Sequence, residues 1–216
     1  MHLSIKEMFR ASWATFKKNA WMFVGATAVV GVASVVLDSL SDNTDGLIEA
    51  IISVFTAVTL WWLYMGFLRM ALTAYAGGML KFEMLFSGRW PMLLQFAIAS
   101  LLTGIIVAIG IVLLIVPGII AQMGLLFAAL FVVDKGMKGI DAMKASWKLT
   151  KGHRWNLFLA FLVLILFNVA GALAFGVGLL VTVPMSLVAL VYLYRELDRG
   201  IQPQVVSAAP AAAPQA

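Results

Sequence analysis

The sequence contains no cysteine. This absence excludes disulfide bonds, thiolate nucleophiles and cysteine metal clusters. Histidine is nearly absent as well: only His2 and His153 occur, and neither has an acidic or histidine neighbour at a spacing typical of metal ligands. We therefore expect no metal site.

Charged residues are scarce, at 12% of the chain, whereas apolar residues make up 63%. Soluble proteins have about 25% charged and about 45–50% apolar residues. A soluble domain of 216 residues with this composition would lack the polar side chains to cover its surface. The composition therefore predicts an integral membrane protein. Its net charge of +5 has to be interpreted by position, and we expect no nucleic acid partner.

Catalytic motifs are also missing. The glycine pair Gly77-Gly78 lacks the adjacent Lys-Ser/Thr of a phosphate-binding loop, and no nucleophile elbow or His/Asp constellation occurs. Asp134 and Asp141 resemble a carboxylate pair, but lysines are interleaved with them, so we interpret them as charge balance. We expect the protein not to be an enzyme and to use no cofactor.

Long uncharged runs predict the membrane spans. A hydrocarbon core about 30 Å thick takes roughly 20 apolar residues as a helix. Residues 92–133 and 155–194 are each about twice that length and are interrupted by Gly and Pro, so each predicts two helices. The fold class is therefore an all-α integral membrane protein with six transmembrane helices in three hairpins, in a single domain over 1–199. The expected spans are about 20–37, 50–68, 92–110, 114–133, 155–173 and 178–194.

The turn of the middle hairpin has two candidate positions. It falls either at Gly110, with Pro117 kinking the fourth helix, or at Pro117-Gly118, with a fourth span shortened to 119–133. A re-entrant loop is a third alternative. Any unwound backbone at this depth must be covered by other helices.

The charges predict the orientation. All fifteen Lys and Arg lie on one side of the six spans, and the acidic stretch 38–49 lies on the other. Because basic loops stay cytoplasmic, both termini are expected in the cytoplasm. A signal peptide with a cleavage site near Val32-Ala33-Ser34 is an alternative, although the first apolar run exceeds the usual 7–15 residues. Residues 200–216, rich in Ala and Pro, predict a disordered cytoplasmic tail.

An internal repeat precedes the spans. The segment EMFRASW at 7–13 recurs as DAMKASW at 141–147, at an offset of 134 residues, and a fainter copy lies at 81–90. Each copy ends near a tryptophan that begins a hairpin. We therefore expect three repeats, each a short amphipathic interfacial helix followed by a hairpin.

The interfacial helices are expected at 3–18 and 138–151. Their apolar stripes are Ile5, Phe9, Trp13 and Phe16 in the first, and Ile140, Met143 and Trp147 in the second. Such helices lie at the membrane surface, with lysines on anionic headgroups. The candidate headgroup contacts are Arg10, Lys17, Lys18, Lys144, Lys148 and Lys151, and the interfacial anchors are Trp13, Trp21, Trp90, Trp147 and Trp155.

Polar residues within the spans are few. No span carries a charge at its centre, where ion-coupled transporters place functional residues. Asn168 and Gln122 are the candidate intramembrane polar residues. Each is able to form an interhelical hydrogen bond, and a transport role is the alternative.

Several segments resemble the membrane domain of glycerophosphoryl diester phosphodiesterase and its uncharacterised multi-span bacterial relatives. They are VPGI at 116–119, VVD at 132–134, AMKASWKLTKG at 142–152 and YREL at 194–197. The resemblance covers roughly residues 90–198 and implies a helical module of the bacterial plasma (inner) membrane. Phosphodiesterase activity in that group belongs to a separate soluble barrel, so no catalytic residue carries over.

Two classes of function follow. The first is a membrane protein that organises lipids or a partner complex through its basic interfacial helices. The second is a small-molecule or lipid transporter or flippase that acts as an oligomer. The expected partners are the bilayer and its anionic headgroups, with a second copy or another membrane protein as further candidates.

Overall fold

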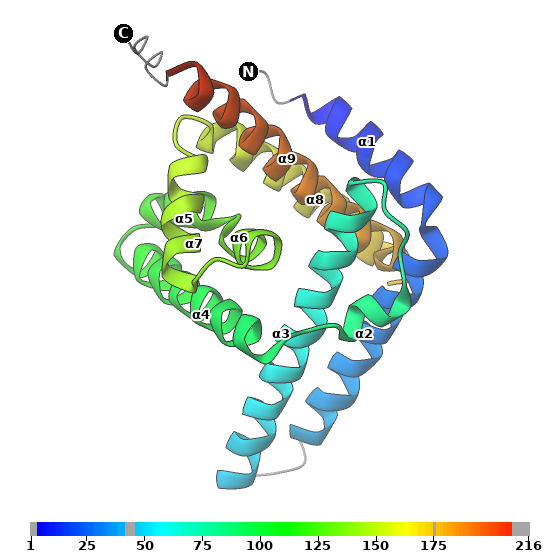
Figure 1. The fold of residues 1–216 in the computed structure, drawn as a ribbon. Coiled ribbons are helices and arrows are strands. Elements are labelled where there is room, and N and C mark those ends of the chain that lie inside the picture. The colour runs from blue at the N-terminus through cyan, green and yellow to red at the C-terminus, as the bar shows by residue number, and fades with distance from the viewer. Residues whose placement is uncertain (1–3, 42–45, 175, 209–216) are drawn as a thin grey trace, which may run out of the picture.

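The regular structure is helical. The computed structural model describes residues 4–41, 46–174 and 176–208, with side chains described over 4–39, 46–174 and 176–199, and no strand occurs in these ranges. The elements are α1 (Ile5–Lys18), α2 (Ala20–Ser41), α3 (Leu47–Tyr75), the 3-10 helix η1 (Phe82–Phe86), α4 (Trp90–Leu113), α5 (Ile115–Leu125), α6 (Ala128–Lys135), α7 (Gly139–Leu149), α8 (Arg154–Leu173) and α9 (Leu179–Ala208). Figure 1 shows their arrangement.

Six helical stretches are long and apolar enough to cross a membrane. They are Ala20–Ser39, Leu47–Tyr75, Trp90–Leu113, Ile115–Lys135, Arg154–Leu173 and Leu179–Arg199. Helix α2 packs against α3, α4 against α5, and α8 against α9. The predicted all-helical class with six spans is confirmed. The fourth span consists of α5 and α6, which a turn at 126–127 separates.

The core lies toward one end of the molecule. Most buried residues of α3 fall between Leu63 and Ala74, and α6 is buried along most of its length. Helix α9 adds Tyr194, which is fully buried. Every described Lys and Arg lies on α1, on or beside a connection between hairpins, or on α9 after Tyr194, and we call this the basic end. The helices therefore pack most closely beside the charged loops.

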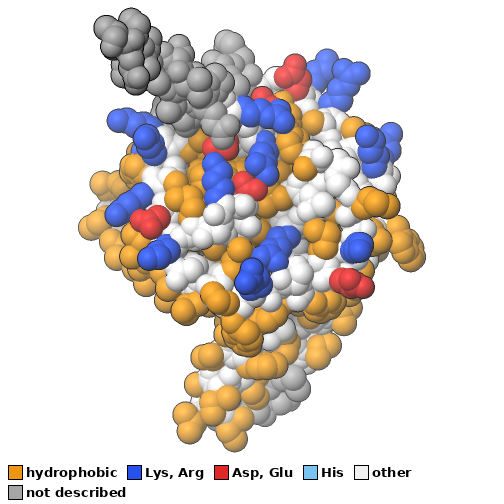
Figure 2. All heavy atoms as spheres, in the orientation of Figure 1, with side chains coloured by type: hydrophobic (Ala, Val, Ile, Leu, Met, Phe, Trp, Pro, Cys, Tyr) orange, Lys and Arg blue, Asp and Glu red, His pale blue; other side chains and the backbone are white. Residues whose placement is uncertain are grey.

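The far parts of the hairpins expose apolar side chains. Leu47 at the start of α3 is 77% exposed, and Val112 near the end of α4 is 86% exposed. Figure 1 shows the α2–α3 hairpin projecting from the rest of the bundle, and Figure 2 shows no basic side chain on that projection. An apolar surface of this extent is unfavourable in water and matches hydrocarbon.

The middle hairpin turns at Leu114. This residue alone is extended, with φ −165° and ψ 140°, between α4 and α5. Both predicted turn positions, Gly110 and Pro117-Gly118, are therefore wrong. Pro117 lies in the first turn of α5, where a backbone N–H has no intrahelical partner, so the helix tolerates proline at this position.

Two glycine pairs let the hairpin helices approach. A Cβ on Gly110 would lie 2.8 Å from the Cα of Gly118, and a Cβ on Gly178 would lie 2.7 Å from the Cα of Gly171. Both distances are shorter than real Cβ contacts allow. The middle and last hairpins therefore close through backbone contact that a side chain would prevent.

Two predicted segments differ from expectation. The third interfacial element is the 3-10 helix η1 with one buried residue, Leu85, and not an amphipathic α-helix. Helix α9 continues to Ala208, so the tail expected from residue 200 begins as helix. Residues 209–216, like residue 3 at the expected start of the first interfacial helix, lie outside the described residues.

Candidate functional site

Helix α1 docks on the protein. Its buried residues are Met8, Ser12 and Phe16, spaced four apart on one face, and the helix runs along α9 (Figure 1). Phe16 was expected in the stripe that enters the membrane but is buried against the protein, so that prediction is wrong for Phe16. Trp13 of the same expected stripe is 43% exposed. Phe9 packs edge-to-face on Phe167 of α8, with ring centroids 5.3 Å apart.

Helix α7 buries the equivalent positions. Ala142, Ser146 and Thr150 are each fully buried, at the same offset of 134 residues from the stripe of α1. Met143 is buried as well, whereas Ile140 and Trp147 are 54% and 41% exposed. The prediction that Ile140, Met143 and Trp147 share one lipid-facing stripe is therefore wrong for Met143. The tryptophan of each copy faces outward, beside the lysines.

A hydrogen-bond network fixes α7 at the break between α5 and α6. The Ser146 hydroxyl donates to the carbonyl oxygen of Gly124 at 2.9 Å and accepts from the Phe127 N–H at 3.1 Å. The Thr150 hydroxyl donates to the same carbonyl at 3.3 Å. At the other end of α7, the Gln95 side-chain oxygen accepts from the Gly139 N–H at 2.9 Å. The orphan backbone groups that helix ends leave are thus satisfied.

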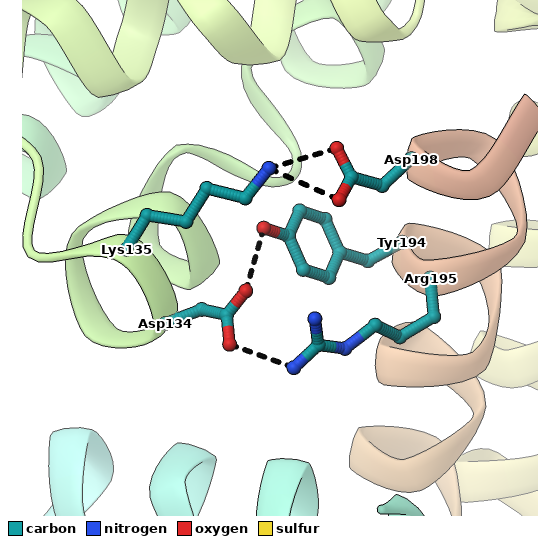
Figure 3. Close-up of polar contacts among 5 residues, drawn as sticks. All are labelled: Asp134, Lys135, Tyr194, Arg195 and Asp198. Atoms are coloured by element: carbon teal, nitrogen blue, oxygen red, sulfur yellow. Dashed lines mark hydrogen bonds and ion pairs between the residues drawn. The ribbon is translucent and has the colours of Figure 1, made fainter. Parts of the chain in front are cut away.

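An ionic latch joins α6 to α9, and we use that name for the five residues in Figure 3: Asp134, Lys135, Tyr194, Arg195 and Asp198. Asp134 accepts from Arg195 at 2.7 Å and from the Tyr194 hydroxyl at 3.0 Å. Lys135 contacts Asp198 at 2.8 Å. Two bases and two acids neutralise one another, so the latch is a structural contact with no free charge.

The sequence contained a signal for this latch. The VVD segment ends one predicted span and the YREL segment ends another on the same side of the membrane. Their charges are therefore at the same depth, but their pairing depends on α6 and α9 being neighbours. The interpretation of Asp134 as charge balance agrees with its ion pair to Arg195.

The six candidate headgroup residues are all exposed. Arg10, Lys17 and Lys18 lie on α1, Lys144 and Lys148 lie on α7, and Lys151 follows it. The ion pairs seen within the described ranges use Lys135, Arg195 and Arg199, and none of these six. Figure 2 shows Lys and Arg side chains spread over this face. The two docked helices and the turn after α7 thus carry positive charge that these ion pairs do not neutralise.

The five anchor tryptophans are exposed to different degrees. Trp21, Trp90 and Trp155, at the starts of the hairpins, are 68–86% exposed, which suits an indole at headgroup depth. The Lys17 ammonium lies 5.3 Å from the Trp13 ring, and the Arg154 guanidinium lies 3.9 Å from the Trp147 ring. Trp13 and Trp147, the equivalent tryptophans of the repeat, therefore each form a cation–π contact with a basic side chain. The sequence pattern did not single out Arg154.

A cleft of about 360 Å³ opens between the start of α4 and the α6–α7 connection. Its lining residues are Arg89, Pro91, Met92, Gln95, Val132, Gly136, Met137 and Lys138. Arg89 and Lys138 are exposed, and no carboxylate lines the cleft. Sequence reasoning missed this site, because its walls come from two segments, 89–95 and 132–138, that are far apart in the sequence.

The two intramembrane candidates occupy different surroundings. Asn168 of α8 donates to the Ser186 hydroxyl of α9 at 2.7 Å, and also to the Leu164 carbonyl. Its Oδ1 atom and the Thr182 hydroxyl are buried without a partner. Gln122 is half-buried on α5. No hydrogen bond between the described residues joins Asn168 to Gln122, so the structure does not bring them into one site.

The fold and the site define a multi-pass α-helical protein with a charged, helix-bearing basic end. The chain belongs to the family described as Domain of unknown function (DUF7847), which matches residues 51–215. The chain is similar to the uncharacterized protein Rv2560 of Mycobacterium tuberculosis, at 25% identity over 96% of this chain and 72% of the relative. It is also similar to the uncharacterized protein Mb2590 of Mycobacterium bovis, at 26% identity over the same shares. No solved structure matches the chain.

Proposed function

We propose that this protein is a non-enzymatic membrane protein that gathers anionic lipids, or an acidic partner bound at the membrane, through α1 and α7. The supporting observation is the division of charge at the basic end. Bases on α6 and α9 are neutralised in ion pairs, whereas the six exposed bases on or next to α1 and α7 are not. Each base near an anionic surface contributes about 1 kcal/mol.

The docking of α1 and α7 strengthens this proposal. A basic segment that is disordered has to lose conformational freedom when it binds headgroups. Here Ser146 and Gln95 hold α7 by hydrogen bonds, and Met8 and Phe16 hold α1 by burial. The lysines are therefore presented in a fixed pattern, which favours binding over a mobile tail of equal charge.

The proposed setting is the bacterial plasma membrane, with both termini in the cytoplasm. The one-sided distribution of the bases supports this orientation. The resemblance to the membrane domain of glycerophosphoryl diester phosphodiesterase supports the same setting. It also supports a module that serves other components of the membrane and carries no phosphodiester-cleaving site of its own.

The experiment compares the lipids that accompany the purified protein. Wild type is extracted gently from membranes containing phosphatidylglycerol and phosphatidylcholine, and the bound headgroups are quantified by mass spectrometry. Reversal of Lys144, Lys148 and Lys151 to Glu is expected to lower the enrichment of phosphatidylglycerol. The matched control changes the same three residues to Arg, which keeps the charge and should keep the enrichment. Equal enrichment in all three proteins would refute the proposal.

A second candidate function, transport of a small molecule or lipid by an oligomer, is favoured by the α8–α9 interface. Asn168 Oδ1 and Thr182 Oγ1 are buried polar atoms without a partner, and such atoms in a membrane protein mark candidate substrate contacts. Changing Asn168 and Gln122 to Leu should abolish transport but leave insertion and assembly intact. Transport by the double variant at the wild-type rate would exclude these residues from a path.

A further inference from the structure

The cleft beside α4 combines a charged rim with an apolar wall. Pro91, Met92, Val132 and Met137 supply apolar surface, and Arg89 and Lys138 supply the charge. Its volume of about 360 Å³ lies within the range of small-ligand sites, about 300–1,000 Å³. The lining therefore suits an anion that carries an apolar part.

The positive charge of the cleft is not offset by the neighbouring acids. Asp134, which follows the lining residue Val132 closely in sequence, is engaged by Tyr194 and Arg195. Asp198 is engaged by Lys135. The ionic latch thus keeps both carboxylates paired with its own bases, and the two bases of the cleft, Arg89 and Lys138, are in none of the ion pairs of the described residues.

A third base, Arg69, lies close to the cleft. The Arg69 guanidinium donates to the Ser87 carbonyl at 2.6 Å and contacts the Met92 sulfur at 2.9 Å. Met92 lines the cleft, so Arg69 contacts a residue of this wall. Neither of its contacts is an anion, and its charge adds to the positive potential at the site.

The depth of the cleft points to lipid. Arg89 immediately precedes Trp90, the first residue of a membrane span. The Trp90 side chain is 68% exposed, and its ring packs edge-to-face on Trp62 with ring centroids 5.1 Å apart. Tryptophans at span ends lie at the level of the headgroups. Arg89 is therefore expected near the depth of lipid phosphates, and Lys138 lines the same cleft.

We propose that this cleft binds the phosphate headgroup of one acidic phospholipid, with Arg89 and Lys138 contacting the phosphate. The site rests on the proposed function, since it takes the same lipid class, and it adds a single defined position to a distributed charged surface. A soluble phosphate ester shares the phosphate chemistry but lacks the apolar part that Met92 and Met137 would cover.

The test is native mass spectrometry of the full-length protein in detergent. Phosphatidylglycerol, phosphatidylcholine with the same acyl chains, and glycerol phosphate are titrated separately. We expect one phosphatidylglycerol to bind saturably and more tightly than the other two. Equal binding of glycerol phosphate would show that the site takes a free phosphate ester and overturn the lipid assignment.

Two charge variants locate the site. Arg89→Gln with Lys138→Gln should weaken binding of the first phosphatidylglycerol roughly 30-fold, from about 1 kcal/mol per base. The control, Lys6→Gln with Lys81→Gln, removes the same charge from two exposed positions that do not line the cleft and are not among the six candidate headgroup residues, and it should leave that affinity unchanged. Equal losses in both double variants would overturn the cleft and leave the proposed function standing.

A third variant keeps every charge. Met137→Trp enlarges a half-buried lining side chain and should block the bound lipid by filling the cleft. Unchanged affinity in this variant would overturn the cleft. If wild type binds phosphatidylglycerol and phosphatidylcholine equally, both the cleft and the proposed function fail.

Discussion

Ser12 and Ser146 occupy equivalent positions in the repeat, and both are fully buried, yet their hydroxyls have different hydrogen-bond partners. The Ser12 hydroxyl donates to the Met8 carbonyl of its own helix at 2.7 Å. The Ser146 hydroxyl bridges two groups at the α5–α6 break. Replacing each serine with alanine should therefore have unequal effects on the free energy of unfolding.

The magnitude for Ser146→Ala follows from its two partners. Losing the bond to Gly124 costs about 1 kcal/mol, and that carbonyl still accepts from Thr150. The buried N–H of Phe127 loses its hydroxyl partner, which costs about 1–3 kcal/mol. The expected loss is about 2–4 kcal/mol. For Ser12→Ala it is under about 1 kcal/mol, because the Met8 carbonyl lies within a helix and alanine is a better helix former than serine.

Two measurements test this prediction, one of the stability of the whole protein and one of α7 alone. Unfolding in detergent by added SDS, followed by circular dichroism, measures the loss of stability in each variant. Hydrogen exchange of the amides in α7 measures its release from the break. Faster exchange in α7 is expected for Ser146→Ala alone. Equal destabilisation by the two alanine variants, or unchanged exchange in α7, would refute the reasoning.

Three further predictions concern packing, charge and topology. Gly66→Ala places a methyl group on the backbone of η1 and should lower the stability by at least about 1–3 kcal/mol. Gly104→Ala faces open space and should raise the stability by up to about 1 kcal/mol. The same SDS unfolding assay measures both changes. Asp134→Asn breaks the half-buried ion pair of the ionic latch and should lower the stability by about 1–3 kcal/mol. Glu196→Gln breaks an exposed ion pair and should lower the stability by under about 0.5 kcal/mol. Similar losses of stability in the two variants would refute the latch. A topology reporter inserted after Thr44 and another fused at the carboxyl terminus should give opposite signals, and identical signals would contradict six spans.

The helical spans were predictable because their signal is local. A run of about 20 apolar residues has to form a helix across the hydrocarbon core, whatever its neighbours are. The expected span of 155–173 differs from α8 by one residue at its start. The turn at Leu114 was not predictable, since Gly110 and Pro117 are both compatible with helix when their surroundings allow it.

The buried faces of α1 and α7 depended on tertiary structure. Their apolar residues were evident from the spacing. Lipid and protein core are both apolar, however, so hydrophobicity does not show whether a side chain faces the lipid or the core. Trp13 and Trp147 face outward, whereas Ser12 and Ser146 are buried. Burial is possible because both hydroxyls are satisfied: Ser146 bonds across to Gly124, and Ser12 bonds to the Met8 carbonyl of its own helix.

The amino-acid sequence alone therefore determined the helical class, the number of helices apolar enough to span a membrane and the positions of the charges along the chain, since each depends on composition or periodicity. Only the tertiary structure decided which bases are neutralised and which remain free. Asp134 and Arg195 are sixty-one residues apart, and so the ionic latch exists only when α6 and α9 are neighbours. The cleft between Arg89 and Lys138 depends on the same packing of distant segments.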